Sequence, residues 1–210
     1  MPSRNRIGVF GGTFDPVHVG HLIIAEILQY ELELGSVLFL PAGRPPHKPE
    51  QELAADHHRL AMLEIAIADC PAFDISTIDL ERLGSSYTAT TLQILTDLYG
   101  PTIDLYFLMG QDSMRDFPSW RDPGKIASLA RLGVALRPYV NVSIADIHDA
   151  VPETRDRIRL VHVPLLEISS RDIRRRIAEG MPFRFQLPHG VANYIETNGL
   201  YLRDDTEGAT

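Results

Sequence analysis

The length, composition and charge of the chain are those of a globular protein with its own core. Its 210 residues are 44% hydrophobic and 23% charged, which is enough for a full core in one domain. The net charge of −8 argues against general nucleic-acid binding, which needs a basic face. Cys70 is the only cysteine, so an internal disulfide and a cysteine-based zinc site are excluded.

The two ends of the chain carry little structural signal. The first residues, 1–6, lack the apolar segment of a signal peptide, and no stretch reaches the apolar length of a membrane span. We therefore expect a cytoplasmic protein that binds neither membranes nor nucleic acid. We expect one domain over residues 1–203, helical from about residue 165 onward, and a polar tail over 204–210.

Strand-like and helix-like patterns alternate along the chain. In chain order, the predicted strands are 6–10, 36–40, 73–76, 103–109, 132–136 and 159–163. The predicted helices are about 20–35, 56–68, 88–99 and 125–129. This alternation predicts an α/β fold: an open, Rossmann-like parallel sheet with helices on both faces and a small C-terminal helical extension. In such sheets ligands bind outside the carboxyl ends of the strands.

The segment GGTFDPVHVGH, residues 11–21, connects the first predicted strand to the first predicted helix. Gly11 and Gly12 carry no Cβ, so the backbone can approach a ligand closely. The start of the helix offers unpaired N–H groups and a positive dipole end, which suit an anion. His18 and His21, three residues apart, lie on the same side of that turn. The segment predicts phosphate chemistry, although many glycine turns only connect elements and many such histidines only cap a helix.

Two further polar segments have a functional and a plain structural interpretation. His47 and Lys48 stand in a proline-rich connection over 41–51. They can fold over a substrate phosphate, with lysine as a point charge, or belong to an ordinary solvated turn. The hydroxyls of 85–88, Thr88 among them, precede a predicted helix and are natural N-cap groups. A role in the site requires that they face the ligand crevice.

Asp112 and Trp120 follow the strand predicted at 103–109. A carboxylate at this place binds ribose hydroxyls in many parallel sheets, or it caps the following turn. A lone tryptophan is usually a core residue. Here the neighbouring Pro118 and Arg121 favour a flat aromatic face that is exposed for a heterocycle.

A second helix start follows the last predicted strand. Ser169 and Ser170 are natural caps, and Arg171, Arg174 and Arg175 share one helix face by their spacing. This arrangement is typical of a triphosphate clamp and equally of a solvated basic face.

Together these segments resemble the bacterial nicotinate-nucleotide adenylyltransferases of the nucleotidyltransferase superfamily. The resemblance covers about residues 7–202. It rests on GGTFDPVHVGH, the PPHK loop, SYT at 86–88, MGQDS with its downstream FPSW, ISSRDIR at 168–174, and LPHGVANYIETNGLY. The superfamily signature alone also fits pantetheine-phosphate adenylyltransferases and cytidylyltransferases.

The resemblance implies a sheet of the nucleotidylyltransferase type and an enzyme of NAD biosynthesis. Such an enzyme transfers the adenylyl group of ATP to nicotinate mononucleotide, giving nicotinate adenine dinucleotide (deamido-NAD) and pyrophosphate. Its Mg²⁺ arrives with ATP and is held mainly by ATP and water. The resemblance also leaves room for a homo-oligomer.

The resemblance further implies the residues of the site, with the two histidines as the catalytic pair. The ATP-binding residues are Gly11, Gly12, Thr13, Phe14, His18, His21, Ser170 and Arg174. The substrate-binding residues are His47, Lys48, Thr88, Asp112, Trp120, Arg121 and Arg137. Within this second set, Trp120 stacks on the pyridine ring, and Thr88 with the backbone N–H of Arg121 binds the nicotinate carboxylate.

Three positions depart from the family pattern. Arg171 stands where threonine is frequent, Gln111 replaces a usually small residue, and Thr90 stands where aspartate is frequent. None of the three is assigned to the chemistry. We expect in-line attack by the mononucleotide phosphate on the α-phosphorus, with catalysis by positioning and electrostatics. An adenylyltransferase for another phosphorylated acceptor and a non-catalytic nucleotide-binding regulator are the two alternatives.

Overall fold

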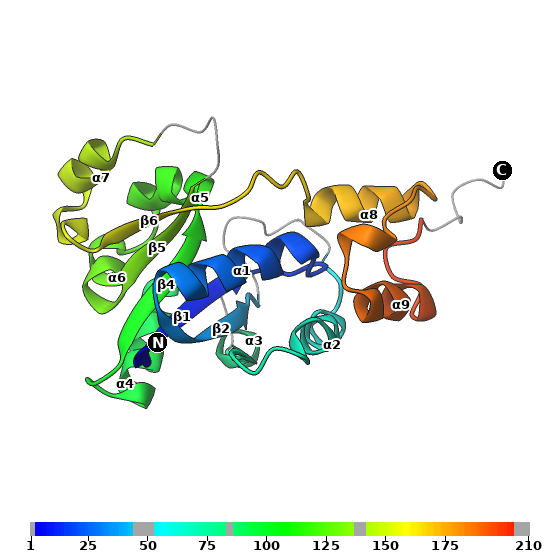
Figure 1. Cartoon of the computed structure of the whole chain (residues 1–210), viewed down its shortest axis with the longest axis horizontal. Coiled ribbons are helices and arrows are strands. Elements are labelled where there is room, and N and C mark those ends of the chain that lie inside the picture. Colours follow the sequence, from blue (N-terminus) through cyan, green and yellow to red (C-terminus); the bar gives the residue numbers. More distant parts are fainter. Residues whose placement is uncertain (1–2, 44–52, 83–85, 137–141, 204–210) are drawn as a thin grey trace.

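A six-stranded parallel sheet forms the centre of the protein (Figure 1). The computed structural model describes residues 3–43, 53–82, 86–136 and 142–203. The strands are β1 (Ser3–Gly12), β2 (Leu34–Pro41), β3 (Phe73–Ile75), β4 (Asp104–Gly110), β5 (Arg131–Leu136) and β6 (Ile158–His162). Their order is β3-β2-β1-β4-β5-β6, and each pairing is parallel. The predicted open parallel sheet is confirmed.

Helices cover both faces of this sheet. They are α1 (Val19–Glu31), α2 (Asp56–Ile67), α3 (Ile78–Glu81), α4 (Thr88–Tyr99), α5 (Gln111–Asp116), α6 (Pro123–Leu129), α7 (Ile144–Ala150), α8 (Ser170–Ala178) and α9 (His189–Thr197). Short 3₁₀ turns lie at Phe117–Ser119, Pro152–Thr154 and Arg184–Gln186. Helices α8 and α9 lie together at one end of the molecule, where α9 packs on α2 (Figure 1). The predicted C-terminal helical extension is therefore confirmed.

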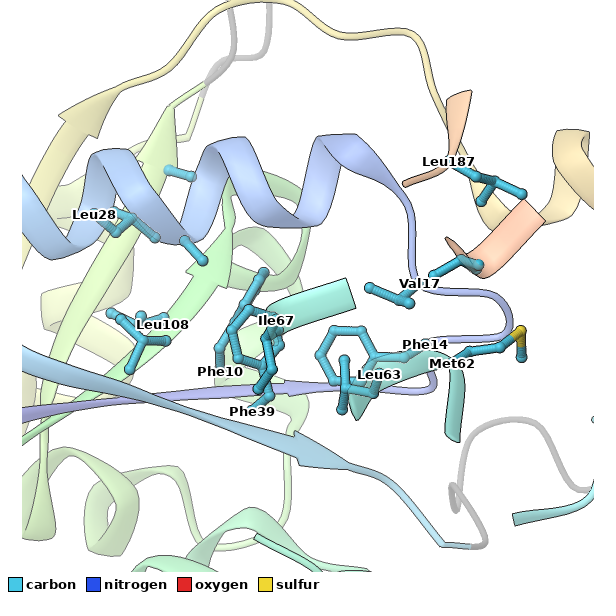
Figure 2. Close-up of a cluster of buried hydrophobic side chains, with 14 of the residues drawn as sticks. Phe10, Phe14, Val17, Leu28, Phe39, Met62, Leu63, Ile67, Leu108 and Leu187 are labelled. Atoms are coloured by element: carbon cyan, nitrogen blue, oxygen red, sulfur yellow. The ribbon is translucent and has the colours of Figure 1, made fainter. Parts of the chain in front are cut away.

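Two hydrophobic clusters fill the space between sheet and helices. The strands alternate between them, so Phe10 of β1 belongs to the cluster under α1 and α2, while Val9 belongs to the cluster under α4 and α6. Figure 2 shows Phe10 in the first cluster with Phe14, Phe39 and Leu28. This alternation places both faces of β1 in the core, as expected for a central parallel strand.

The helix predicted at 20–35 is too long at its C-terminal end. It ends at Glu31, and Leu34 already belongs to β2. The chain reverses between them at Glu33, whose φ of 54° lies in the left-handed region. Leu34 is fully buried, so burial in the sheet outweighs continuation of the helix. The short helices α3, α5 and α7 were not predicted, since they are too brief to show a helical period.

Within the described ranges, no helix is long and apolar enough to cross a lipid bilayer.

Candidate active site

The strand order reverses direction between β1 and β4, which is where open parallel sheets place their ligands. Two cavities lie at this point, beyond the carboxyl end of β1. Thr13 lines the larger cavity, whereas Gly11 and Gly12 line the smaller one. The last residues of β1 and the residue that follows them therefore stand between the two cavities.

The larger cavity has a volume of about 440 Å³ and lies between the starts of α1 and α8. Its lining residues are Thr13, His18, Gly20, His21, Ile24, Leu166, Ile168, Ser169, Ser170, Arg171 and Arg174. It thus combines two imidazoles, hydroxyls and two guanidinium groups with two helix N-termini. Such a site suits a polyanion.

The histidine pair is built into the first turn of α1. His18 is the N-cap residue, and its backbone N–H donates to Nδ1 of His21 over 3.2 Å. The two rings stack with centroids 3.7 Å apart. A Cβ at Gly20 would come within 3.0 Å of the His18 ring, so glycine leaves room for the stack. Because Nδ1 of His21 accepts a hydrogen bond, neutral His21 carries its proton on Nε2 and is a donor there.

Three hydrogen bonds from other elements hold the segment that follows β1. Arg59 of α2 donates to the Thr13 carbonyl over 2.8 Å. From α8, Ser170 Oγ donates to the Pro16 carbonyl over 2.9 Å, and Arg174 Nη1 donates to the Asp15 carbonyl. Fully buried Arg59 was missed in the sequence. Its spacing from the apolar positions of α2 puts it on the buried helix face, which was the available signal.

The smaller cavity, about 150 Å³, lies on the other side of Gly11 and Gly12, which are the last residues of β1 and not the turn expected from the sequence, and it borders α4. Thr88, the first residue of α4, and Trp120 both line it, so the structure brings these two predicted residues together. The Trp120 ring packs edge-on against Phe107, with centroids 5.9 Å apart. Trp120 is thus partly a core residue and partly a wall of the cavity.

A buried acid also lines the smaller cavity. Asp79 is 5% exposed, accepts a hydrogen bond from the Thr91 hydroxyl over 2.6 Å, and lies 3.1 Å from Arg82. Burial raises the pKa of Asp79, and the Thr91 hydrogen bond and the Arg82 charge oppose that rise. The sequence offered no signal for Asp79, because its hydrogen-bond partner Thr91 lies twelve positions further along the chain, in another helix.

Comparison with known proteins agrees with this geometry. The cytidylyltransferase-like family matches residues 9–176. A probable nicotinate-nucleotide adenylyltransferase of Thermomicrobium roseum is 52% identical over 94% of this chain and 92% of its own length. The protein of the same name from a Roseiflexus species is 44% identical over 95% of this chain and 99% of its own length. The chain belongs to the nicotinate-nucleotide adenylyltransferase family.

Solved structures with lower sequence identity to this chain share its fold. The nicotinic acid mononucleotide adenylyltransferase of Plasmodium falciparum complexed with NaAD has a TM-score of 0.77 at 21% identity, covering 94% of this chain and 98% of its own. The same enzyme complexed with APC has a TM-score of 0.75 at 22% identity and the same coverage.

Several residues that the family resemblance assigns lie away from the two cavities. Phe14 has a φ of 48° and is 1% exposed, and its ring points into the core beside Phe10 (Figure 2). Only its backbone is therefore available to a ligand. Asp112 lies in the exposed first turn of α5, with Arg115 at 3.7 Å. The exposed Arg121 side chain lies over the Tyr87 ring, 4.3 Å from its centroid.

The arginine face predicted on α8 is divided. Arg171 and Arg174 line the larger cavity, but Arg175 is turned to solvent and pairs with Asp172 at 2.5 Å and Glu179 at 2.8 Å. Hydrogen bonds from Arg176 and Arg175 lower the pKa of Asp172. Helical spacing groups Arg175 with Arg171 and Arg174, but it does not show which side of that helix face borders the cavity and which borders solvent.

Three of the predicted site residues, His47, Lys48 and Arg137, lie outside the described residues.

Proposed function

We propose that this protein transfers the adenylyl group of ATP to nicotinate mononucleotide, producing deamido-NAD and pyrophosphate. The observation that carries the proposal is the pair of cavities that meet at residues 11–13. One is basic and lies at two helix starts, and the other holds an aromatic ring and a threonine hydroxyl. The two substrates of such a transfer need two sites whose reacting ends meet.

ATP occupies the larger cavity in this proposal. Its phosphates lie at the start of α1 against His18 and His21, and Ser170 and Arg174 of α8 hold the polyphosphate tail. The backbone of Gly11–Phe14 passes close to the nucleotide. Free N–H groups and the positive dipole end of each helix favour an anion at this place.

Nicotinate mononucleotide occupies the smaller cavity. The Trp120 ring stacks on the pyridine, and the Thr88 hydroxyl and the backbone N–H of Arg121 donate to the carboxylate. His47, Lys48 and Arg137 complete the substrate-binding set, with His47 and Lys48 near the mononucleotide phosphate. Asp112, which lies outside the lining of the cavity, contacts only the exposed part of the substrate in this proposal.

The reaction is a direct displacement at the α-phosphorus of ATP. A phosphate oxygen of the mononucleotide forms the new P–O bond, and the bond to the β-phosphate oxygen breaks, so the electron pair leaves with pyrophosphate. The attacking phosphate has a second pKa of about 6, hence it is ionised at neutral pH and needs no general base. The protein contributes alignment of the two phosphates and N–H donors for the charge that develops, among them Nε2 of neutral His21.

We propose that Mg²⁺ enters with ATP. Magnesium keeps several water ligands and binds readily through substrate phosphates, so it requires few protein ligands. Within the ranges that the structure describes, no group of three or more His, Cys, Asp and Glu side chains is placed to hold a metal ion. The hydroxyl and imidazole groups of the larger cavity suit a hydrated magnesium–phosphate complex.

The decisive experiment compares nicotinate mononucleotide with its nicotinamide analogue. The Thr88 hydroxyl and a backbone N–H are donors, so they pair with both carboxylate oxygens, whereas the amide directs its NH₂ group at one of them. An unpaired buried donor costs roughly 1–3 kcal/mol. We expect kcat/KM to be at least about tenfold higher for the nicotinate form, since about 1.4 kcal/mol is tenfold.

Thr88→Val should reduce this preference and leave the KM for ATP unchanged, and Thr88→Ser, which keeps the hydroxyl, should retain it. Equal rates for the two mononucleotides would contradict the acceptor assignment. Pyrophosphate release only with another phosphorylated acceptor would establish the other adenylyltransferase. ATP binding without pyrophosphate release from any acceptor would favour a nucleotide-binding regulator.

A further inference from the structure

A buried carboxylate links the C-terminal segment to the larger cavity. Asp15 is fully buried, and its Oδ1 accepts hydrogen bonds from the Tyr201 hydroxyl over 2.6 Å and from the backbone N–H of Ala54 over 3.3 Å. Its Oδ2 lies 3.5 Å from Nη1 of Arg174. The two oxygens thus face different partners, a neutral hydroxyl on one side and a cavity-lining guanidinium on the other.

Arg174 depends on Asp15 for its position. Nη1 of Arg174 donates to the Asp15 carbonyl and lies near the carboxylate of the same residue. The Arg174 side chain is 19% exposed and lines the cavity. Any rotation of the Asp15 side chain therefore changes what holds this guanidinium at the cavity wall.

Backbone conformation and packing both hold Tyr201 in place at Asp15. It follows α9 and Gly199 and has a φ of 65°, a conformation that tyrosine rarely adopts. Its ring packs against the hydrophobic cluster under α1 and α2. Burial and the neighbouring Asp15 charge raise the pKa of Tyr201. The hydroxyl consequently remains protonated, so it is a permanent donor to Asp15.

We infer that Tyr201 is a positioning residue for ATP, which acts through Asp15 on Arg174. The inference rests on the proposed function for the identity of the ligand. The Tyr201 bond fixes the Asp15 carboxylate, the carboxylate fixes the guanidinium, and the guanidinium meets the polyphosphate. Tyr201 itself lies behind the cavity wall and does not line the cavity.

The test is Tyr201→Phe, which removes the hydroxyl and keeps the ring. We expect the Kd for ATP, measured calorimetrically without acceptor, to rise about tenfold, as for the loss of one hydrogen bond to a charged group. The KM for ATP should rise in parallel, while the KM for the mononucleotide stays within about twofold. The matched control is Tyr194→Phe, which removes the hydroxyl that bonds Nδ1 of His58 at 2.9 Å. It should lower the thermal midpoint similarly and leave the Kd for ATP unchanged.

A double-mutant cycle separates positioning from general stability. In an Arg174→Gln background, Tyr201→Phe should weaken ATP binding no further, because its effect passes through the missing guanidinium. An unchanged Kd in Tyr201→Phe, or an equal loss in both backgrounds, would overturn the inference. If Tyr201→Phe does not fold, Asp15→Asn replaces it, with the same rise in Kd expected and an unchanged Kd again overturning the inference. If the unmutated protein binds ATP but does not turn over nicotinate mononucleotide, only the proposed function fails.

Discussion

The imidazole rings of His18 and His21 stack on each other, with centroids 3.7 Å apart and 23° between their planes. His18 is only 6% exposed, and His21 packs edge-on against Phe14 at 5.1 Å. The His18 backbone N–H donates to Nδ1 of His21 over 3.2 Å, and the His21 backbone N–H donates to the His18 carbonyl over 2.9 Å. The two histidines thus order the start of α1 at the same time as they line the larger cavity.

Substitutions that keep the cap should separate these two roles. In His18→Asn and His21→Gln, the new side chains remain good residues for the N-cap and N3 positions. We expect turnover to fall by about 10² or more, the usual loss for one preorganised donor, with thermal midpoints near that of the unmutated protein. His18→Ala, which lacks a capping side chain, should be about 1 kcal/mol less stable than His18→Asn. Full turnover in either cap-keeping variant would refute the catalytic assignment, and a collapsed midpoint in both would make the pair structural.

Arg171 should bind the outer phosphates of ATP. It is exposed and lines the larger cavity, whereas Arg174 is held by Asp15. We expect Arg171→Gln to raise the KM for ATP and the inhibition constant for pyrophosphate about two- to fivefold, as for an exposed ion pair. The effect should shrink at high salt. Arg175→Gln is the control, because Arg175 pairs with Asp172 and Glu179, and it should leave both constants unchanged. Equal effects of the two variants would contradict a specific contact.

Trp120 should report on the acceptor site. It is the only tryptophan and lines the smaller cavity, so its fluorescence is not confused with that of another residue. Adding nicotinate mononucleotide or deamido-NAD should quench or shift the emission, because a heterocycle stacks on the ring. Trp120→Ala should mainly weaken acceptor binding, and Trp120→Phe, which keeps an aromatic ring, should weaken it less. An unchanged spectrum at saturating ligand would make Trp120 a core residue only.

Stability should decrease in mild acid because of His58. Burial and the neighbouring His57 charge lower the pKa of His58, and its Nδ1 contacts the Tyr194 hydroxyl at 2.9 Å. In the unfolded chain, where the histidine pKa is about 6.5, His58 takes up a proton at a higher pH than in the folded chain. The stability contribution is therefore complete above about pH 6.5 and is lost as the pH falls towards the lowered folded pKa.

Thermal midpoints at neutral and mildly acid pH measure this contribution. His58→Gln should reduce the decrease in midpoint, and His57→Gln should reduce it in part by removing the repelling charge. An equal decrease in His58→Gln and in the unmutated protein would assign the acid sensitivity to other groups.

Elements with a strong local residue pattern are predictable from the amino-acid sequence. The helix over Thr88–Tyr99 matches its prediction at both ends, because an apolar face and flanking turn signals mark it. The histidine pair was equally readable, since His18 and His21 are three residues apart and helical geometry brings them together. The end of α1 was misplaced, because Tyr30, Leu32 and Leu34 alternate with glutamates across it, and this pattern does not mark the boundary with β2.

The distant residues that complete the site are determined by long-range packing. The Ser170 hydroxyl meets the Pro16 carbonyl across 154 positions of sequence, and the Tyr201 hydroxyl meets Asp15 across 186. No local pattern carries such distances, because they follow from how α8 and the C-terminal segment pack against the sheet. The same packing turned the Phe14 ring into the core and Arg175 to solvent. Local sequence spacing identifies the side chains that can contribute to a site, but long-range packing determines which of them face it.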